Sequence, residues 1–146
     1  MFAPTQEDVR RFFCGVYQKS LAGQPMEALE TLASLWIDEH PEYHSDLADT
    51  EAAVERDYDA SVNGRSNPFL HLSMHLSISE QCSIDQPAGI RQAVELLTKR
   101  LDSLHAAHHE VMECLQDMLW QGQVHQRAPD GAAYVEAVQR RATQRN

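Results

Sequence analysis

Histidine is the residue type in this sequence whose number and spacing are best suited to chemistry. The chain has 146 residues and contains eight histidines. Three pairs stand four residues apart: His71 with His75, His105 with His109, and His40 with His44. On an α-helix this spacing puts two imidazoles on one face, with about 5–6 Å between their Cβ atoms, so that both can bind one metal ion. The sequence therefore predicts a transition-metal site.

Glu113 extends the second pair, because it follows His109 by four more residues on the same predicted helix. Metal sites in helical bundles are built from side chains that point inward from neighbouring helices. Imidazole and carboxylate donors suit iron, zinc or manganese in a mono- or dinuclear centre. If catalytic, such a metal would activate water or dioxygen. The predicted ligand set comprises His71, His75, His105, His109 and Glu113.

A non-metal explanation of the same histidines is that they serve packing and hydrogen bonding. The spacing HxxxH arises often by chance, and the sequence has no HExxH, no repeated ExxH and no cysteine ligand motif. His40 and His44 form a weaker pair, because Pro41 interrupts the helix that would join them. The chain would then be a non-catalytic interaction or adaptor protein. A third alternative is a pH sensor, since imidazoles titrate near neutrality.

Two helices are predicted at the N-terminal end from the spacing of apolar residues. Thr5 is suited to cap the first, which Gly23 ends. A second helix is predicted to begin at Pro25 and to run to about His40, where Pro41 interrupts it. The short connection between them predicts an antiparallel helical hairpin.

The middle of the chain is less regular. One or two short helices are expected up to Tyr58, with Thr50 as a cap, and residues 59–68 (DASVNGRSNP) are typical of a loop. The stretch Leu70–Ser79 alternates apolar and polar residues as a strand does. We nevertheless predict a helix, because Asn67–Pro68 is a helix-start signal and the stretch is poor in β-branched residues. A strand would separate His71 from His75 and remove the proposed site.

Three more helices are predicted after the break at Asp85 and Pro87. They cover Ile90–Leu101, a long segment that Asp102 or Ser103 caps and that runs to about Gln123, and a terminal segment opened by Pro129 and Asp130. We therefore expect an all-α bundle of about five to seven helices in a single domain. The expected parts are residues 1–58, the loop 59–68 and residues 69–146.

Charge and composition limit the partners and the compartment. Lys and Arg number 12 against 22 Asp and Glu, a formal charge of −10. A negative field repels phosphate backbones, so nucleic-acid binding is not expected. No stretch resembles a signal peptide or a membrane span, and three cysteines without a CxxC pair are typical of a reduced compartment. We expect a cytoplasmic protein, and a homodimer or another protein partner stays open.

Several blocks of the sequence resemble an uncharacterised bacterial family, domain of unknown function 1841. They are NPFLHLSMHLSISEQCSIDQPAGI, HAAHHEVMECLQDMLW and APDGAAYVEAV, together with HPEYH and the opening helix. The resemblance covers nearly the whole chain. It implies a bacterial source and carries no activity, substrate or cofactor, so the metal hypothesis depends on the histidines alone.

Overall fold

The computed structural model describes residues 5–58 and 67–144, and these form two compact units. Unit 1 comprises residues 1–76 and unit 2 residues 77–146, so the division falls within one helix, α6 (Pro68–Ile84). The described residues contain eight α-helices, one 3-10 helix and no strand. The all-α class is therefore confirmed, with slightly more helices than the five to seven expected. Each unit is described by itself.

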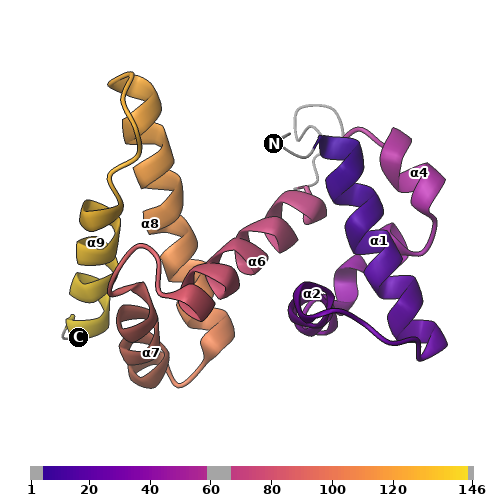
Figure 1. The fold of residues 1–146 in the computed structure, drawn as a ribbon, viewed down its shortest axis with the longest axis horizontal. Helices are drawn as coiled ribbons and strands as arrows, with labels where there is room; N and C mark the ends of the chain where they lie inside the picture. The colour runs from indigo at the N-terminus through magenta and orange to yellow at the C-terminus, as the bar shows by residue number, and fades with distance from the viewer. Residues whose placement is uncertain (1–4, 59–66, 145–146) are drawn as a thin grey trace. The chain divides into compact units, whose positions relative to one another are not determined.

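Unit 1 is built from short helices around one apolar core (Figure 1). Its elements are α1 (Gln6–Ala22), α2 (Ala28–Asp38), η1 (Pro41–Tyr43), α3 (His44–Leu47), α4 (Thr50–Glu55) and the first part of α6. The core residues are Phe13, Cys14, Val16, Ala33, Trp36, Ile37, Leu47, Ala53, Tyr58, Phe69, Leu72 and Leu76.

Helix α1 has the ends that the sequence predicts. The hydroxyl of Thr5 accepts a hydrogen bond from the backbone N–H of Asp8 at 3.0 Å, and the Asp8 carboxylate accepts from the N–H of Thr5 at 3.0 Å. This reciprocal pair satisfies two amide groups that a helix start otherwise leaves without partners. Gly23 ends the helix with φ of 67°, a conformation that favours glycine.

Helix α2 begins later than predicted and has a different direction. It starts at Ala28 rather than Pro25, because the Glu30 carboxylate accepts the backbone N–H of Glu27 at 2.9 Å and sets the first turn there. Figure 1 shows α2 end-on while α1 runs across the view, so the two helices cross. The predicted antiparallel hairpin is therefore wrong. The four residues between Gly23 and Ala28 allow the chain to turn away from α1.

Arg10 of α1 holds the end of α4. Helix α4 begins at Thr50. Its cap is Asp49 and not Thr50, because the Asp49 carboxylate accepts the backbone N–H of Ala52 at 3.3 Å. At the other end, Nη1 of Arg10 donates to three backbone carbonyls at 2.7 to 3.2 Å. These carbonyls belong to Ala53, Val54 and Arg56. A buried cation thus closes the negative end of the helix.

The alternating stretch Leu70–Ser79 is helical, as predicted, and lies within α6. Asn67 caps this helix, because its side-chain oxygen accepts the backbone N–H groups of Phe69 at 2.9 Å and Leu70 at 3.2 Å. These bonds fix the start of the helix at Pro68, whose missing N–H costs nothing in the first turn. His71 and His75 are therefore one turn apart on one helix. The predicted loop 59–68 lies outside the described residues up to position 66.

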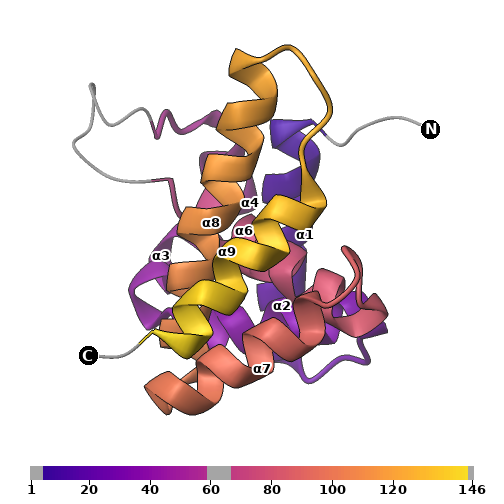
Figure 2. The same ribbon diagram turned by 90° about the vertical axis from the view of Figure 1, so that its left-hand side faces the viewer.

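Unit 2 consists of the rest of α6 with three longer helices, and α9 packs against both α7 and α8 (Figure 2). The helices are α7 (Ile90–Leu101), α8 (Leu104–Val124) and α9 (Gly131–Thr143). Side-chain caps begin α8 at Ser103 and α9 at Asp130. The buried apolar residues of unit 2 are Ile78, Ile90, Ala93, Val94, Leu97, Ala107, Val111, Met112, Cys114, Leu115, Tyr134, Val135 and Val138.

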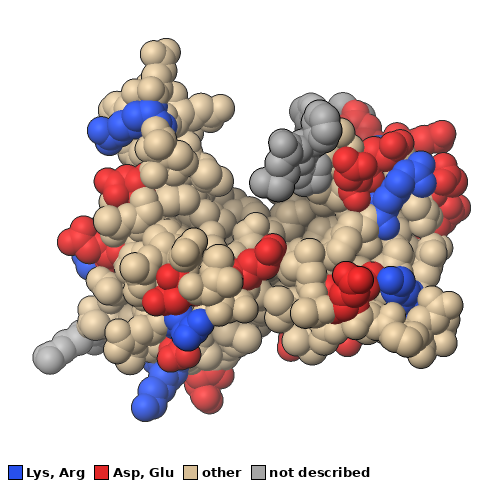
Figure 3. Space-filling view, viewed as in Figure 1, with Lys and Arg blue, Asp and Glu red and all other residues tan. Residues whose placement is uncertain are grey.

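Acidic side chains are prominent on the faces of both units that Figure 3 displays, as the net charge leads one to expect. Among the residues that the structure describes, none of the helices combines the length and the apolar character that crossing a bilayer requires.

Candidate metal centre

His40 is placed by the joint between α2 and η1. The main chain leaves the helical conformation there, with φ of −129° and ψ of 64°. Its Nδ1 donates a hydrogen bond to the backbone carbonyl of Trp36 at 2.7 Å. In the neutral ring this bond fixes the proton on Nδ1, so Nε2 carries the lone pair. Metal-binding histidines typically make such a bond with the nitrogen that does not bind the metal.

The Nε2 atom of His71 contacts the Nε2 atoms of both His75 and His40. One turn apart on α6, the two rings place their Nε2 atoms 3.2 Å from each other. Nε2 of His71 is also 3.1 Å from Nε2 of His40. The three rings are mutually inclined by 52° to 83°, so they converge on one point instead of stacking. We call His40, His71 and His75 the histidine trio.

Hydrogen bonds between neutral rings cannot account for both N···N contacts of the trio. A neutral imidazole has one N–H and one lone pair, so the Nε2 of His71 can donate or accept but cannot do both. Because the Nε2 of His40 carries a lone pair, at most one well-directed hydrogen bond can form across the two N···N contacts. A metal ion about 2.1 Å from each nitrogen accepts all the lone pairs and holds the nitrogens about 3.0 to 3.4 Å apart. The observed separations match that range.

Aromatic rings and burial keep the trio in place. The indole of Trp36 stacks on His75, with ring centroids 4.0 Å apart and planes inclined by 11°. Tyr43 stacks on His40 at 5.2 Å and 2°. His75 is fully buried and His40 is 2% exposed, whereas His71 is partly exposed. Two members of the trio are therefore enclosed by the fold, and His71 is the member that solvent reaches.

The donor atoms of the trio belong to a group that could hold a metal ion. One ligand nitrogen of each ring lies within 4.8 Å of those of the other two. Imidazole nitrogen suits zinc, copper, iron and nickel, and it discriminates against magnesium and calcium, which prefer oxygen.

His44 lies outside this arrangement, although the sequence pairs it with His40. Its Nε2 donates to the backbone carbonyl of Ile37 at 2.9 Å, and its ring packs against Tyr17 with centroids 5.0 Å apart. The 3-10 turn after Pro41 breaks the helical register that would place both imidazoles on one face. His44 therefore fits the non-metal explanation, because its imidazole hydrogen-bonds to the main chain.

The predicted ligands of unit 2 lie together on α8. The rings of His105 and His109 meet edge to face, with centroids 4.5 Å apart. The Glu113 carboxylate forms an ion pair with Arg141 of α9. His108 is 2% exposed, and its pKa is lowered to about 3 by burial in the first place and then by the nearby His105 and His109. The membership of His105, His109 and Glu113 in a metal site stays a prediction.

His40 is the member of the trio that the predicted ligand set lacks. It precedes His71 by 31 residues, and the spacing rule that finds pairs on one helix cannot detect such a partner. The available signal was its position on the inner face of the second helix. That signal is weak, because apolar-face histidines also bind main-chain carbonyls.

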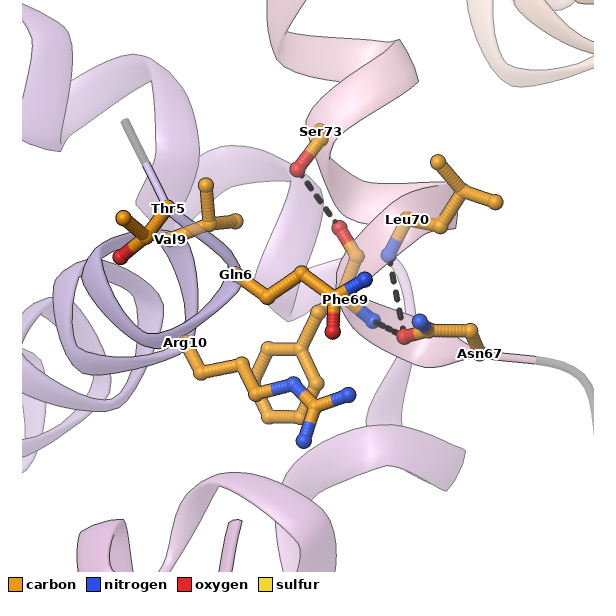
Figure 4. Close-up of a pocket in the computed structure, with 8 residues that line it drawn as sticks. All are labelled: Thr5, Gln6, Val9, Arg10, Asn67, Phe69, Leu70 and Ser73. Carbon is orange, nitrogen blue, oxygen red and sulfur yellow. Dashed lines mark hydrogen bonds between the residues drawn. The ribbon is translucent and has the colours of Figure 1, made fainter. Parts of the chain in front are cut away.

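A cavity of about 240 Å³ in unit 1 is another feature that could receive a ligand. It lies where α1 and α6 begin, and Figure 4 shows Arg10 and Phe69 at its wall. The guanidinium carbon of Arg10 is 5.7 Å from the centroid of the Phe69 ring and 5.1 Å from that of Tyr58. The guanidinium already donates to carbonyls at the end of α4, so the position of Arg10 at the cavity wall is explained by the fold and not by a ligand.

Comparisons with known proteins give a family without an assigned activity. The family model described as Domain of unknown function (DUF1841) matches residues 5–140 of the 146. No curated protein and no solved structure matches the chain.

Proposed function

The chain belongs to the DUF1841 family of unknown function, and we propose from its own geometry that it binds a transition-metal ion at the histidine trio. The observation that carries the proposal is the pair of Nε2···Nε2 contacts at 3.1 and 3.2 Å. Neutral imidazoles cannot form a hydrogen bond across both contacts, whereas one cation bound to the three lone pairs accounts for both distances.

Zinc or iron is the ion that we infer, with zinc favoured because all three donors are imidazole nitrogens; manganese, which the full predicted ligand set also allows, prefers oxygen donors. The hydrogen bond from His40 to the carbonyl of Trp36 supports the same conclusion, because it orients the ring before the ion arrives. We further infer that the ion stabilises unit 1, since it joins the end of α2 to α6. The alternative is that the trio only packs and that the protein acts through a partner.

The decisive experiment is metal analysis of protein purified without a histidine tag, followed by titration of chelator-treated protein with Zn²⁺. We expect one ion per chain. We also expect saturating Zn²⁺ to stabilise the fold, by about 2.7 kcal/mol when its concentration is 100 times the Kd. His71→Ala is the variant of choice, because His71 is the partly exposed member of the trio and its loss leaves the core packing largely intact.

The matched control is His125→Ala. His125 is exposed, and its Nε2 lies 3.1 Å from the side-chain oxygen of Gln121, so the substitution removes an imidazole far from any core. Wild type and His125→Ala should bind Zn²⁺ equally, and His71→Ala should bind it at least 100-fold more weakly. Equal affinity in all three proteins, or wild type that holds no metal, would overturn the proposal and favour the packing alternative.

A further inference from the structure

The histidine trio supplies no negative charge. The described side chains whose ligand atoms converge in this group are all histidines, without a carboxylate or a thiolate among them. Neutral imidazoles share electron pairs with a cation but do not reduce its formal charge. A divalent ion here would keep a charge of +2 beside two buried rings, His40 and His75.

Such a charge is costly where water is scarce. Burying an ion without a counter-charge costs several kcal/mol, and the ion's own charge dominates the electrostatics of its site. The aromatic rings of Trp36 and Tyr43 stack on two of the ligands and lower the local polarity. The binding of an anion directly to the ion removes one unit of charge and therefore stabilises the occupied site.

We propose that the metal ion at the histidine trio binds a small monoanion from solution, of the carboxylate class, as an additional ligand. The inference rests on the proposed function, since it requires the ion. The trio by itself supplies three of the four to six ligands that zinc and its neighbours take, so it does not complete the coordination of the ion. His71, the partly exposed member, marks the side from which the anion enters. Because His40 and His75 are buried, we expect a small anion to reach the ion more readily than a bulky one.

Cobalt(II) tests both proposals separately, because its visible absorption reports on its ligands. Chelator-treated protein is loaded with Co²⁺ and titrated with acetate, with azide as a second monoanionic probe and with benzoate as a bulky carboxylate, all at constant ionic strength. We expect acetate and azide to change the spectrum in a saturable manner with one site per Co²⁺, and benzoate to bind at least tenfold more weakly. By linkage, an anion at ten times its Kd should raise the Co²⁺ affinity about tenfold.

The possible outcomes distinguish the metal proposal from the anion inference. A saturable anion effect in wild type and in His125→Ala, lost together with Co²⁺ binding in His71→Ala, supports both. Co²⁺ binding whose spectrum and affinity ignore acetate and azide overturns the anion inference and leaves the metal proposal standing. Equal binding of benzoate and acetate overturns the small-anion specificity. Failure of wild type to bind Co²⁺ or Zn²⁺ overturns the metal proposal and the inference with it.

Discussion

The histidines of unit 1 and those of α8 in unit 2 are assembled in different ways. The trio combines two neighbours on α6 with His40, which lies 31 residues before His71, and its Nε2 atoms approach within 3.1 and 3.2 Å. On α8, all three histidines come from one helix: two rings meet edge to face, and the third, His108, is buried. Spacing along a helix therefore supplies two donors, and the third depends on tertiary packing.

The largest effect in this comparison should come from His40→Ala. Removing the donor from the second segment leaves a pair of the kind found on α8, so we expect the Zn²⁺ affinity to fall at least 100-fold, or about 2.7 kcal/mol. His44→Ala is the matched control, because His44 lies in the same segment and also donates to a main-chain carbonyl. Calorimetric titration of the two variants, with circular dichroism to confirm the fold, makes the measurement. Equal losses in both would contradict the assignment of His40.

The buried His108 of α8 should make the unfolding free energy depend on pH. Because its pKa is lowered to about 3 from 6.5, the unfolded chain binds a proton between these values that the folded chain does not. The stability that depends on a neutral His108 is fully present above pH 6.5 and is lost as the pH falls towards 3. Between pH 7 and pH 5, metal-free wild type should lose about 2 kcal/mol more unfolding free energy than His108→Gln. Urea unfolding at several pH values measures this.

The control for that experiment is His125→Gln, which replaces an exposed imidazole on the same unit. Its pH dependence should follow that of wild type. If His108→Gln also follows wild type, then His108 does not stay neutral in the folded protein between pH 7 and pH 5.

The starts of the helices were predictable wherever residues close in the sequence determine them. Thr5, Asn67 and Asp130 begin their helices as the sequence indicates, because each cap depends on residues within one turn. The start of α2 was misplaced because Glu30 caps the turn after Pro25. Its direction relative to α1 depends on packing that periodicity does not encode. Within the candidate site, His71 and His75 share a helix and were predictable, whereas His40 reaches them only through the fold.

The double variant His105→Ala/His109→Ala tests the part of the predicted ligand set that belongs to unit 2. If the sequence-based prediction is right, the Zn²⁺ affinity should fall about tenfold, less than for His40→Ala, because the double variant keeps all three donors of the trio, with His40 oriented by the Trp36 carbonyl. The number of ions per chain should stay at one. An unchanged affinity would remove His105 and His109 from the set, and a lower stoichiometry would indicate a separate ion on α8.

Glu113→Gln should have the smallest effect. The Glu113 side chain is 64% exposed and pairs with Arg141, which is 33% exposed and also lies 3.6 Å from Glu110. Exposed ion pairs contribute about 0.2 to 1 kcal/mol, and Arg141 keeps Glu110 as a partner, so we expect a loss of less than about 0.5 kcal/mol in unfolding free energy. Because a carboxylate held by arginine must give up that partner to bind an ion, the Zn²⁺ affinity should change less than about twofold. Chemical unfolding and Zn²⁺ titration measure the two quantities, with Glu110→Gln as the control. A tenfold loss of affinity in Glu113→Gln alone would return this carboxylate to the ligand set and give α8 the mixed imidazole and carboxylate donors that the trio lacks.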